Sequence, residues 1–79
     1  MQLSIHSLKK TLYDGEAKSV TLASTTGELT ILNNHLPLIT TLAPGTIQVT
    51  EETGHIFKIA ASSGTLEVQP GSKVAILVN

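Results

Sequence analysis

The stretch SVTLASTTGELTIL, residues 19–32, carries the pattern that decides the fold. Val20 and Leu22 alternate with small or polar residues, as expected of a strand with one buried face. The dipeptide Thr26-Gly27 then marks a turn, because glycine adopts backbone angles that other residues avoid. A second short apolar run, Leu29–Leu32, follows directly. The stretch therefore predicts two short strands separated by a turn.

The rest of the chain repeats this pattern and shows no sustained helical period. Further strands are predicted at Gln2–His6, Thr46–Thr50, Ile56–Ala60, Thr65–Val68 and Lys73–Val78. The last of these is apolar enough to be buried on both faces. Turn signals stand between the strands, at Asp14-Gly15, Pro44-Gly45, Glu51 to Gly54 and Pro70-Gly71. The sequence predicts an all-β fold, a single flattened antiparallel β-sandwich or barrel domain over residues 1–79.

Length and composition limit the core and point to a partner. A chain of 79 residues hides only about 60% of the surface that it exposes when unfolded. Tyr13 and Phe57 are the only large aromatic residues, so aliphatic residues and alanine must build the core. We therefore expect marginal stability and an interaction that covers part of the surface.

Composition also excludes several functions. The net charge is −1 and all five basic residues are lysine, so neither the basic surface nor the arginine contacts of a nucleic-acid-binding protein are expected. The absence of cysteine excludes disulfides, thiolate metal sites and cysteine nucleophiles. No apolar run is long enough to span a bilayer, so we expect no direct membrane insertion.

No catalytic, cofactor or metal site is predicted. Asp14 is the only aspartate, and its place before Gly15 is typical of a tight turn rather than of a catalytic triad. His6, His35 and His55 lack the spacing of metal ligands. Glu51 and Glu52 fall in a predicted turn and are expected to be solvated there.

Two other classes of function remain open. Small all-β carrier domains present one lysine on an exposed turn for biotin or lipoate, and Lys18 is the candidate here. It leads into the strand Val20–Leu22, however, and no methionine or aspartate flanks it. A generic β-sandwich binding module is the other class, but two aromatic residues are few for a ligand groove.

The segment GELTILNNHLPLITTLAPG, residues 27–45, is the best candidate for an interaction surface. Leu36, Leu38 and Ile39 cannot all point into one thin core, so part of this apolar surface is covered by another strand or by a partner. Exposed apolar groups beside Glu28 and His35 indicate a docking edge.

Five motifs, in order and at compatible spacing, resemble the N-terminal domain of the epsilon subunit of F-type ATP synthases. They are Leu12-Tyr13-Asp14-Gly15-Glu16, Gly27-Glu28-Leu29-Thr30-Ile31-Leu32, His35-Leu36-Pro37-Leu38, Leu42-Ala43-Pro44-Gly45 and Gly64-Thr65-Leu66-Glu67-Val68. The resemblance extends from about Leu3 to Val78. It implies a sandwich of about ten short strands at the foot of the rotating central stalk.

In that family the domain has no catalysis of its own and joins the gamma subunit to the polar loops of the membrane c-ring. The resemblance therefore implies a peripheral position at an energy-transducing membrane, on the cytoplasmic side in bacteria or on the matrix or stromal side in organelles. It matches Glu28 to an acid that faces the c-ring, and His35 to a histidine near gamma and the ring. The full set of expected partner-binding residues is Thr26, Gly27, Glu28, Leu29, Asn34, His35, Leu36, Pro37, Leu38 and Leu42.

The chain also departs from the family pattern. Thr30 replaces a usual glycine, Asn33-Asn34 replaces a Pro-Gly-like turn, and Thr65 replaces a phenylalanine expected in the core. Most members continue after the strand matched by Lys73–Val78 into a helical hairpin that restrains ATP hydrolysis. This sequence ends at Asn79, so the expectation for it as written is no hairpin-based inhibition and no ATP binding.

Overall fold

The computed structural model describes all residues from Met1 to Asn79 and consists of nine strands with no helix. The strands are β1 (Gln2–His6), β2 (Thr11–Glu16), β3 (Ser19–Ser24), β4 (Gly27–Leu32), β5 (Leu38–Leu42), β6 (Gly45–Thr50), β7 (Ile56–Ala61), β8 (Gly64–Gln69) and β9 (Lys73–Val78). The predicted all-β class is confirmed, with nine strands in place of the expected ten or so.

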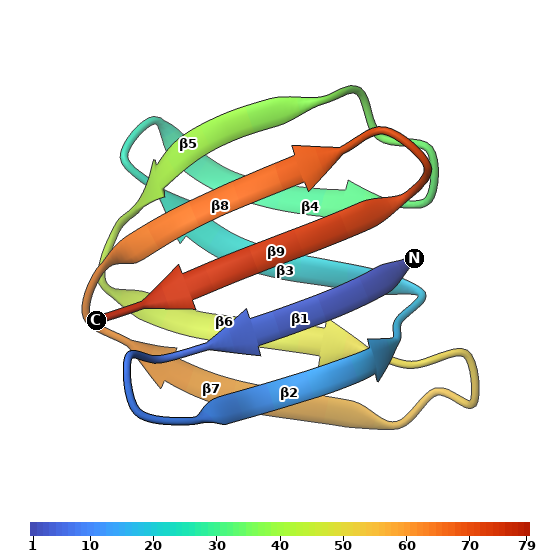
Figure 1. Cartoon of the computed structure of the whole chain (residues 1–79), viewed down its shortest axis with the longest axis horizontal. Helices are drawn as coiled ribbons and strands as arrows, with labels where there is room; N and C mark the ends of the chain where they lie inside the picture. Colours follow the sequence, from blue (N-terminus) through green and yellow to red (C-terminus); the bar gives the residue numbers. More distant parts are fainter.

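The strands form two layers that are joined at one end, where β5 approaches β3 (Figure 1). Backbone pairing runs in the order β2-β1-β9-β8-β5-β3-β6-β7, and β4 pairs with the other edge of β3. Strands β5, β8, β9, β1 and β2 make one layer, and β4, β3, β6 and β7 make the other. The backbones of the two layers are joined at the end of β3, where Ser24 pairs with Leu42 and the amide of Thr25 donates to the carbonyl oxygen of Thr41. Neighbouring strands are antiparallel except for β1 and β9, which are parallel.

This topology leaves two open edges. At one edge, β4 of one layer lies near β5 of the other, and we call this the β4–β5 edge (Figure 1). At the opposite edge, the terminal strands β2 and β7 face each other across the layers, and we call this the β2–β7 edge.

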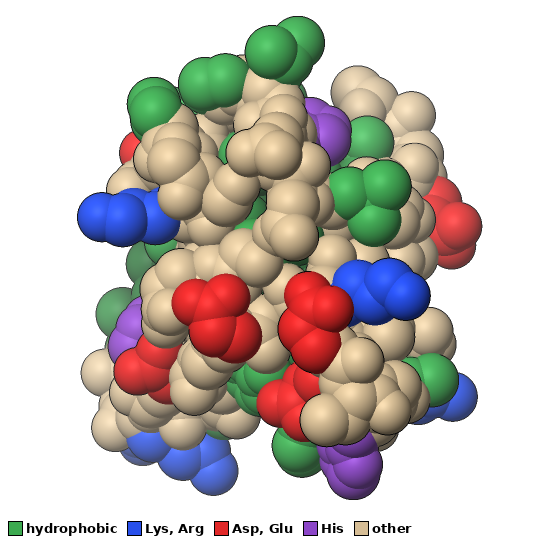
Figure 2. Space-filling view, turned by 90° about the vertical axis from the view of Figure 1, so that its right-hand side faces the viewer, with side chains coloured by type: hydrophobic (Ala, Val, Ile, Leu, Met, Phe, Trp, Pro, Cys, Tyr) green, Lys and Arg blue, Asp and Glu red, His purple; other side chains and the backbone are tan.

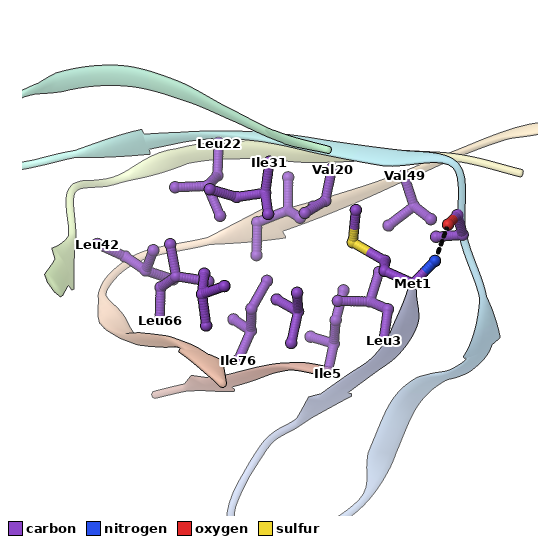
Figure 3. Packing of buried hydrophobic residues seen from close by; sticks show 14 of the residues in the cluster. Met1, Leu3, Ile5, Val20, Leu22, Ile31, Leu42, Val49, Leu66 and Ile76 are labelled. Atoms are coloured by element: carbon purple, nitrogen blue, oxygen red, sulfur yellow. Dashed lines mark hydrogen bonds between the residues drawn. The ribbon is translucent and has the colours of Figure 1, made fainter. Parts of the chain in front are cut away.

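The core lies between the two layers. It contains 15 buried apolar residues. Those from β1, β5, β8 and β9 face those from β3, β4 and β6, as Figure 3 shows for Leu3 and Ile76 on one side and Val20 and Ile31 on the other. Burying a side chain of this size stabilises the fold by about 1.5–3 kcal/mol. Neither β2 nor β7 contributes a fully buried side chain, so the core is thinnest at the β2–β7 edge.

The predicted turn at Asp14-Gly15 is wrong. Both residues lie inside β2, where they pair with Ser4 and Leu3 of β1. The real turn comes earlier, at residues 7–10. Pairing with β1 provides the backbone partners that a local turn would otherwise supply, and tertiary pairing therefore overrides the local turn signal.

Strand β9 is also not buried on both faces as predicted. Val74, Ile76 and Val78 face the core, whereas Leu77 is exposed. Thr65 of β8 pairs with Leu77 and is exposed as well. Position 65 therefore lies on the outer face, and the threonine does not remove an aromatic residue from this core. Thr30 is likewise on an outer face, where its hydroxyl lies 3.0 Å from that of Thr21.

Candidate docking surface

The predicted partner-binding residues lie along the β4–β5 edge. Thr26 and Gly27 form the end of the β3–β4 turn, and Glu28 and Leu29 follow in β4. The β4–β5 loop, residues 33–37, contains the next four predicted residues, and β5 contains the last two. The fold therefore brings the predicted set to one edge of the molecule.

The two polar turns do not meet, however. Gly27 begins β4 and the Asn33-Asn34 turn follows its end. A strand of six residues is about 20 Å long, so Glu28 and His35 lie at opposite ends of β4 (Figure 1). One compact partner site cannot surround both residues, and a surface that uses both must extend along the whole edge.

The β4–β5 edge has two ends, and one of them carries the β4–β5 loop. A cluster of exposed apolar side chains lies at that end. Leu36 is 79% exposed, Ile39 71% and Leu32 56%. With Pro37, which is also exposed, these residues form what we call the apolar edge patch. Figure 2 views this end of the molecule and shows hydrophobic side chains gathered at the top, where β5 runs in Figure 1. Exposed apolar side chains gathered at one place on the surface mark interaction sites in folded proteins.

Three of the predicted residues contribute little or nothing to this surface. Leu42 is only 2% exposed and belongs to the core, so its expected place on the surface is wrong. Leu29 and Leu38 are half-buried and pack against the core. In contrast, Ile39 and Leu32 were absent from the predicted set, although both are exposed. Strand alternation explains Ile39, because its neighbours Leu38 and Thr40 point toward the interior.

Hydrogen bonds shape the loop that carries the patch. The amide of His35 donates to the carbonyl oxygen of Leu32 over 3.2 Å, which closes the turn after β4. The ring Nδ1 of His35 lies 2.8 Å from the carbonyl oxygen of Leu36. Asn34 has a positive φ of 63° and contacts Ser72 of the β8–β9 turn. His35 is thus engaged with its own loop, while the carboxylate of Glu28 is exposed and has no ion pair.

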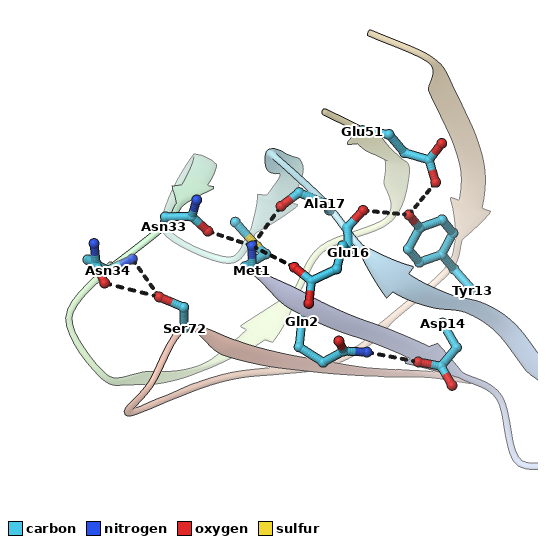
Figure 4. A network of polar contacts seen from close by, with 10 residues as sticks. All are labelled: Met1, Gln2, Tyr13, Asp14, Glu16, Ala17, Asn33, Asn34, Glu51 and Ser72. Carbon is cyan, nitrogen blue, oxygen red and sulfur yellow. Dashed lines mark hydrogen bonds and ion pairs between the residues drawn. The ribbon is translucent and has the colours of Figure 1, made fainter. Parts of the chain in front are cut away.

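A polar network continues from this loop across the same end of the molecule (Figure 4). The amino group of Met1 donates to the carbonyl oxygen of Ala17 over 2.8 Å and to Oδ1 of Asn33. The carboxylate of Glu16 lies 3.6 Å from the same amino group. The network ties the start of β1 to the segment between β2 and β3 and to the end of β4. Ser72 and Met1 carry no local signal that would have predicted these contacts, since their partners are distant in sequence.

Glu51 differs from the solvated residue that was predicted. Its Oε2 accepts a hydrogen bond of 2.7 Å from the hydroxyl of Tyr13, whose ring packs edge-on against Phe57 with 5.4 Å between centroids. Burial, the hydrogen bond to Glu51 and the negative charges of Glu51 and Glu16 raise the pKa of Tyr13 to about 12. Glu52 is exposed, in agreement with the prediction. These contacts belong to the β2–β7 edge and close it.

The candidate docking surface offers exposed apolar side chains that suit it to binding. No group of three or more His, Asp or Glu side chains is placed to hold a metal ion. Lys18 is exposed in the bend between β2 and β3, and its amide donates to the carbonyl oxygen of Thr50. With strands alone making up the structure, no helix crosses a membrane. The fold and its apolar edge patch therefore define a small β-sandwich domain of the interaction class.

Comparison with known proteins identifies the family. The family model for the beta-sandwich domain of the ATP synthase delta/epsilon chain matches residues 1–79. The chain belongs to this family. It is 42% identical, over 71 residues, to the ATP synthase epsilon chain of Bordetella petrii. That match covers 90% of this chain and 50% of the relative, so the chain spans about half of the relative's length.

Solved structures share the fold. A chain of the mitochondrial ATP synthase of Euglena gracilis, in a structure described as OSCP/F1/c-ring, matches with a TM-score of 0.93 and 23% identity, covering 99% of this chain and 49% of that one. A chain of the Tetrahymena thermophila mitochondrial ATP synthase, described as central stalk/c-ring, matches with a TM-score of 0.81 and 19% identity, covering 99% and 62%. The resemblance inferred from the sequence motifs is confirmed at the level of family and fold.

Proposed function

We propose that this domain is a non-catalytic rotor component of an F-type ATP synthase. It docks the gamma subunit onto the c-ring and thereby couples ion-driven rotation to ATP synthesis. The match of the family model to the whole chain supports this proposal, as do relatives named as epsilon chains and central-stalk structures. Such a position makes the domain peripheral to the membrane, held there by other subunits.

The observation that carries the proposal is the apolar edge patch. Three of the seven exposed large hydrophobic side chains, Leu32, Leu36 and Ile39, fall within eight residues of sequence. Exposed to water, these side chains contribute no hydrophobic free energy to folding. A partner that covers them removes apolar area from water, which favours binding. Pro37 stiffens the backbone between Leu36 and Ile39, so little flexibility is lost when a partner binds.

The rest of the domain suits a mechanical role. A close-packed core of aliphatic side chains, such as that between the two layers, deforms little under load. Torque from the ring must reach gamma without slip, and a stiff sandwich between two rotor subunits enlarges their contact. Because all three components turn together, the interface stays fixed during turnover.

The test is capture of a purified gamma–c-ring subcomplex from the same source by the full-length protein. Leu36→Asp places a charge in the apolar edge patch and is expected to reduce capture by at least about tenfold, since a buried unpaired charge is costly. Leu8→Asp is the matched control: Leu8 is 86% exposed, compared with 79% for Leu36, but it lies in the β1–β2 turn beside Asn79, at the other end of the molecule. It should bind as the unmodified protein does.

Two further variants measure how far the interface extends. Glu28→Lys and His35→Ala change the two ends of β4, and both should weaken assembly more than they lower the melting temperature. Equal loss of stability in the free protein would make these residues structural instead. Failure of the unmodified, folded protein to capture the subcomplex would reject the proposed function.

A further inference from the structure

The β4–β5 loop and the β8–β9 turn are joined by a reciprocal pair of hydrogen bonds. The amide of Asn34 donates to Oγ of Ser72 over 3.0 Å, and the Ser72 hydroxyl donates to Oδ1 of Asn34 over 3.1 Å (Figure 4). The two residues are 38 positions apart in the sequence. One hydroxyl group thus binds both the amide and the side-chain oxygen of Asn34. We call these two hydrogen bonds the Asn34–Ser72 staple.

The backbone conformation of both residues is unusual. Asn34 has a φ of 63° and Ser72 a φ of 57°, and they are the only residues other than glycine with positive φ. Glycine is the default residue in this region, and asparagine tolerates it better than most, but serine does not. Such conformations persist only where surrounding contacts hold them, and they gather at functional sites. Here the two unusual residues contact each other.

Backbone and side-chain contacts anchor both sides of the staple: Asn33, next to Asn34, accepts a hydrogen bond from the amino group of Met1. The amide of Gln2 donates to the carbonyl oxygen of Ser72 over 2.9 Å, which fixes the β8–β9 turn to β1. Beyond Asn34, the loop carries Leu36, which is largely exposed and makes no core contact. The conformation of Leu36 and Pro37 therefore depends in part on how Asn34 is held, together with the pairing of Leu38 with β8.

We propose that Ser72 is a positioning residue for docking: through the staple it preorganises the β4–β5 loop, so that the apolar edge patch is presented to the rotor partner in its bound conformation. The inference rests on the proposed function and deepens it. Ordering a loop before binding reduces the entropy lost on association. It also adds the β8–β9 turn to the part of the molecule that determines affinity.

The variant that isolates the staple is Ser72→Gly in the full-length protein. Glycine accepts the positive φ without strain and keeps the carbonyl group that binds Gln2, so only the hydroxyl is lost. We expect the amide of Asn34 to exchange with solvent about three to ten times faster, and the dissociation constant for the gamma–c-ring subcomplex to rise by a similar factor. The melting temperature should hardly change, because relief of backbone strain offsets the lost hydrogen bonds.

Two variants control this experiment. Asn34→Asp keeps an acceptor for the Ser72 hydroxyl and tolerates the same backbone conformation, so its amide should retain slow exchange in the free protein. Ser62→Gly makes the same substitution in the β7–β8 turn, at an exposed serine, and should change neither measurement.

The outcomes separate the staple from the proposed function. Exchange of the Asn34 amide is measured in the free protein by NMR, so it tests the staple even if the unmodified protein fails to bind the subcomplex and the rotor role is rejected. Unchanged exchange in Ser72→Gly would overturn the staple itself. Faster exchange with unchanged affinity would show that the staple orders the loop without contributing to docking, and would overturn the proposal.

Discussion

The β2–β7 edge and the β4–β5 edge of this domain differ in the side chains that cover them. At the β2–β7 edge, the ring of Tyr13 packs against Phe57 and its hydroxyl binds Glu51, so side chains bridge the terminal strands of the two layers. At the β4–β5 edge no aromatic side chain bridges the layers. Hydrogen bonds join them at its two ends, between Thr25 and Thr41 and between Asn34 and Ser72, while Leu36 and Ile39 remain exposed. The chain places both of its large aromatic residues at the first edge and none at the second.

This difference shows how a small domain can divide its surface between stability and binding. Neither β2 nor β7 buries a side chain fully, and the aromatic contact adds to the partial burial of Leu12 and Ile59. Apolar residues at the β4–β5 edge are not needed to complete the core, since β5 already buries Leu42 and half-buries Leu38. These residues are therefore available to bind a partner. Substitutions at the two edges should accordingly affect different properties.

The largest effect on stability is expected from Tyr13→Ala. It removes the aromatic bridge and leaves Phe57 and Glu51 without their partner, so the free energy of unfolding should fall by about 2–3 kcal/mol. Leu36→Ala, at the other edge, should change it by less than about 0.5 kcal/mol. Chemical denaturation of both variants measures the difference. Similar losses in the two variants would contradict the division between the edges.

Alkaline pH should weaken the β2–β7 edge selectively. The pKa of Tyr13 is raised to about 12 in the folded protein from 10.0, so its stabilising contribution is fully present below pH 10 and is lost as the pH rises toward 12. The folded state holds the proton that the unfolded state has released, and stability therefore falls with pH across this window. The loss should be on the order of 2 kcal/mol. Tyr13→Phe should lack this part of the pH dependence, and denaturation curves at several pH values test it.

Glu51 should account for part of the raised pKa. Tyr13 is the only tyrosine and there is no tryptophan, so tyrosinate absorbance reports this residue alone. Glu51→Gln removes the negative charge that disfavours tyrosinate, and the titration midpoint should move toward that of free tyrosine. Glu52→Gln, its exposed neighbour in sequence, should leave the midpoint unchanged. If both variants shifted the midpoint equally, the raised pKa would reflect the general negative charge of this region rather than the specific contact with Glu51.

The smallest effect on folding, but a visible one on association, is expected from Lys58→Thr. Strand β7 pairs only with β6, so its outer edge offers free backbone groups to another strand. A lysine in such an edge strand opposes pairing with other chains, whereas threonine favours strands. Sedimentation should show greater self-association, with folding stability within about 0.5 kcal/mol of the original. Lys18→Thr, outside the strands, is the control. Unchanged sedimentation of Lys58→Thr would mean that the aromatic bridge protects this edge without help from the lysine.

Local patterns predicted much of the fold. Strands β1, β3 and β6 follow from strict alternation, and the turns around residues 51–54 and 70–71 occur where their residue types predicted them. Strand β2 was missed because Asp14-Gly15 has turn chemistry, yet its backbone groups pair with β1. Strand β5 was missed because Pro37 precedes it and the run LITTL has no clear period, yet it pairs along its length with β8.

The candidate surface was predicted in the same uneven way. The excess of apolar residues between positions 36 and 39 indicated a docking edge, since they exceed what one thin core can hold. Their individual orientations required the strand register, which sends Leu42 inward and Ile39 outward. The contact between Asn34 and Ser72 depends on two turns meeting in space, and neither turn carries a local signal for the other.

By itself, the sequence determined the all-β class, the positions of most strands and the family, because alternation, turn residues and motif spacing are properties of neighbouring residues. Only the tertiary structure decided which strands pair, including the parallel pairing of β1 with β9, and which edge is closed by Tyr13 and which is left open. The physical reason is that strand pairing and side-chain contacts across the core join residues tens of positions apart. Their free energy depends on the arrangement of the whole chain rather than on any local segment.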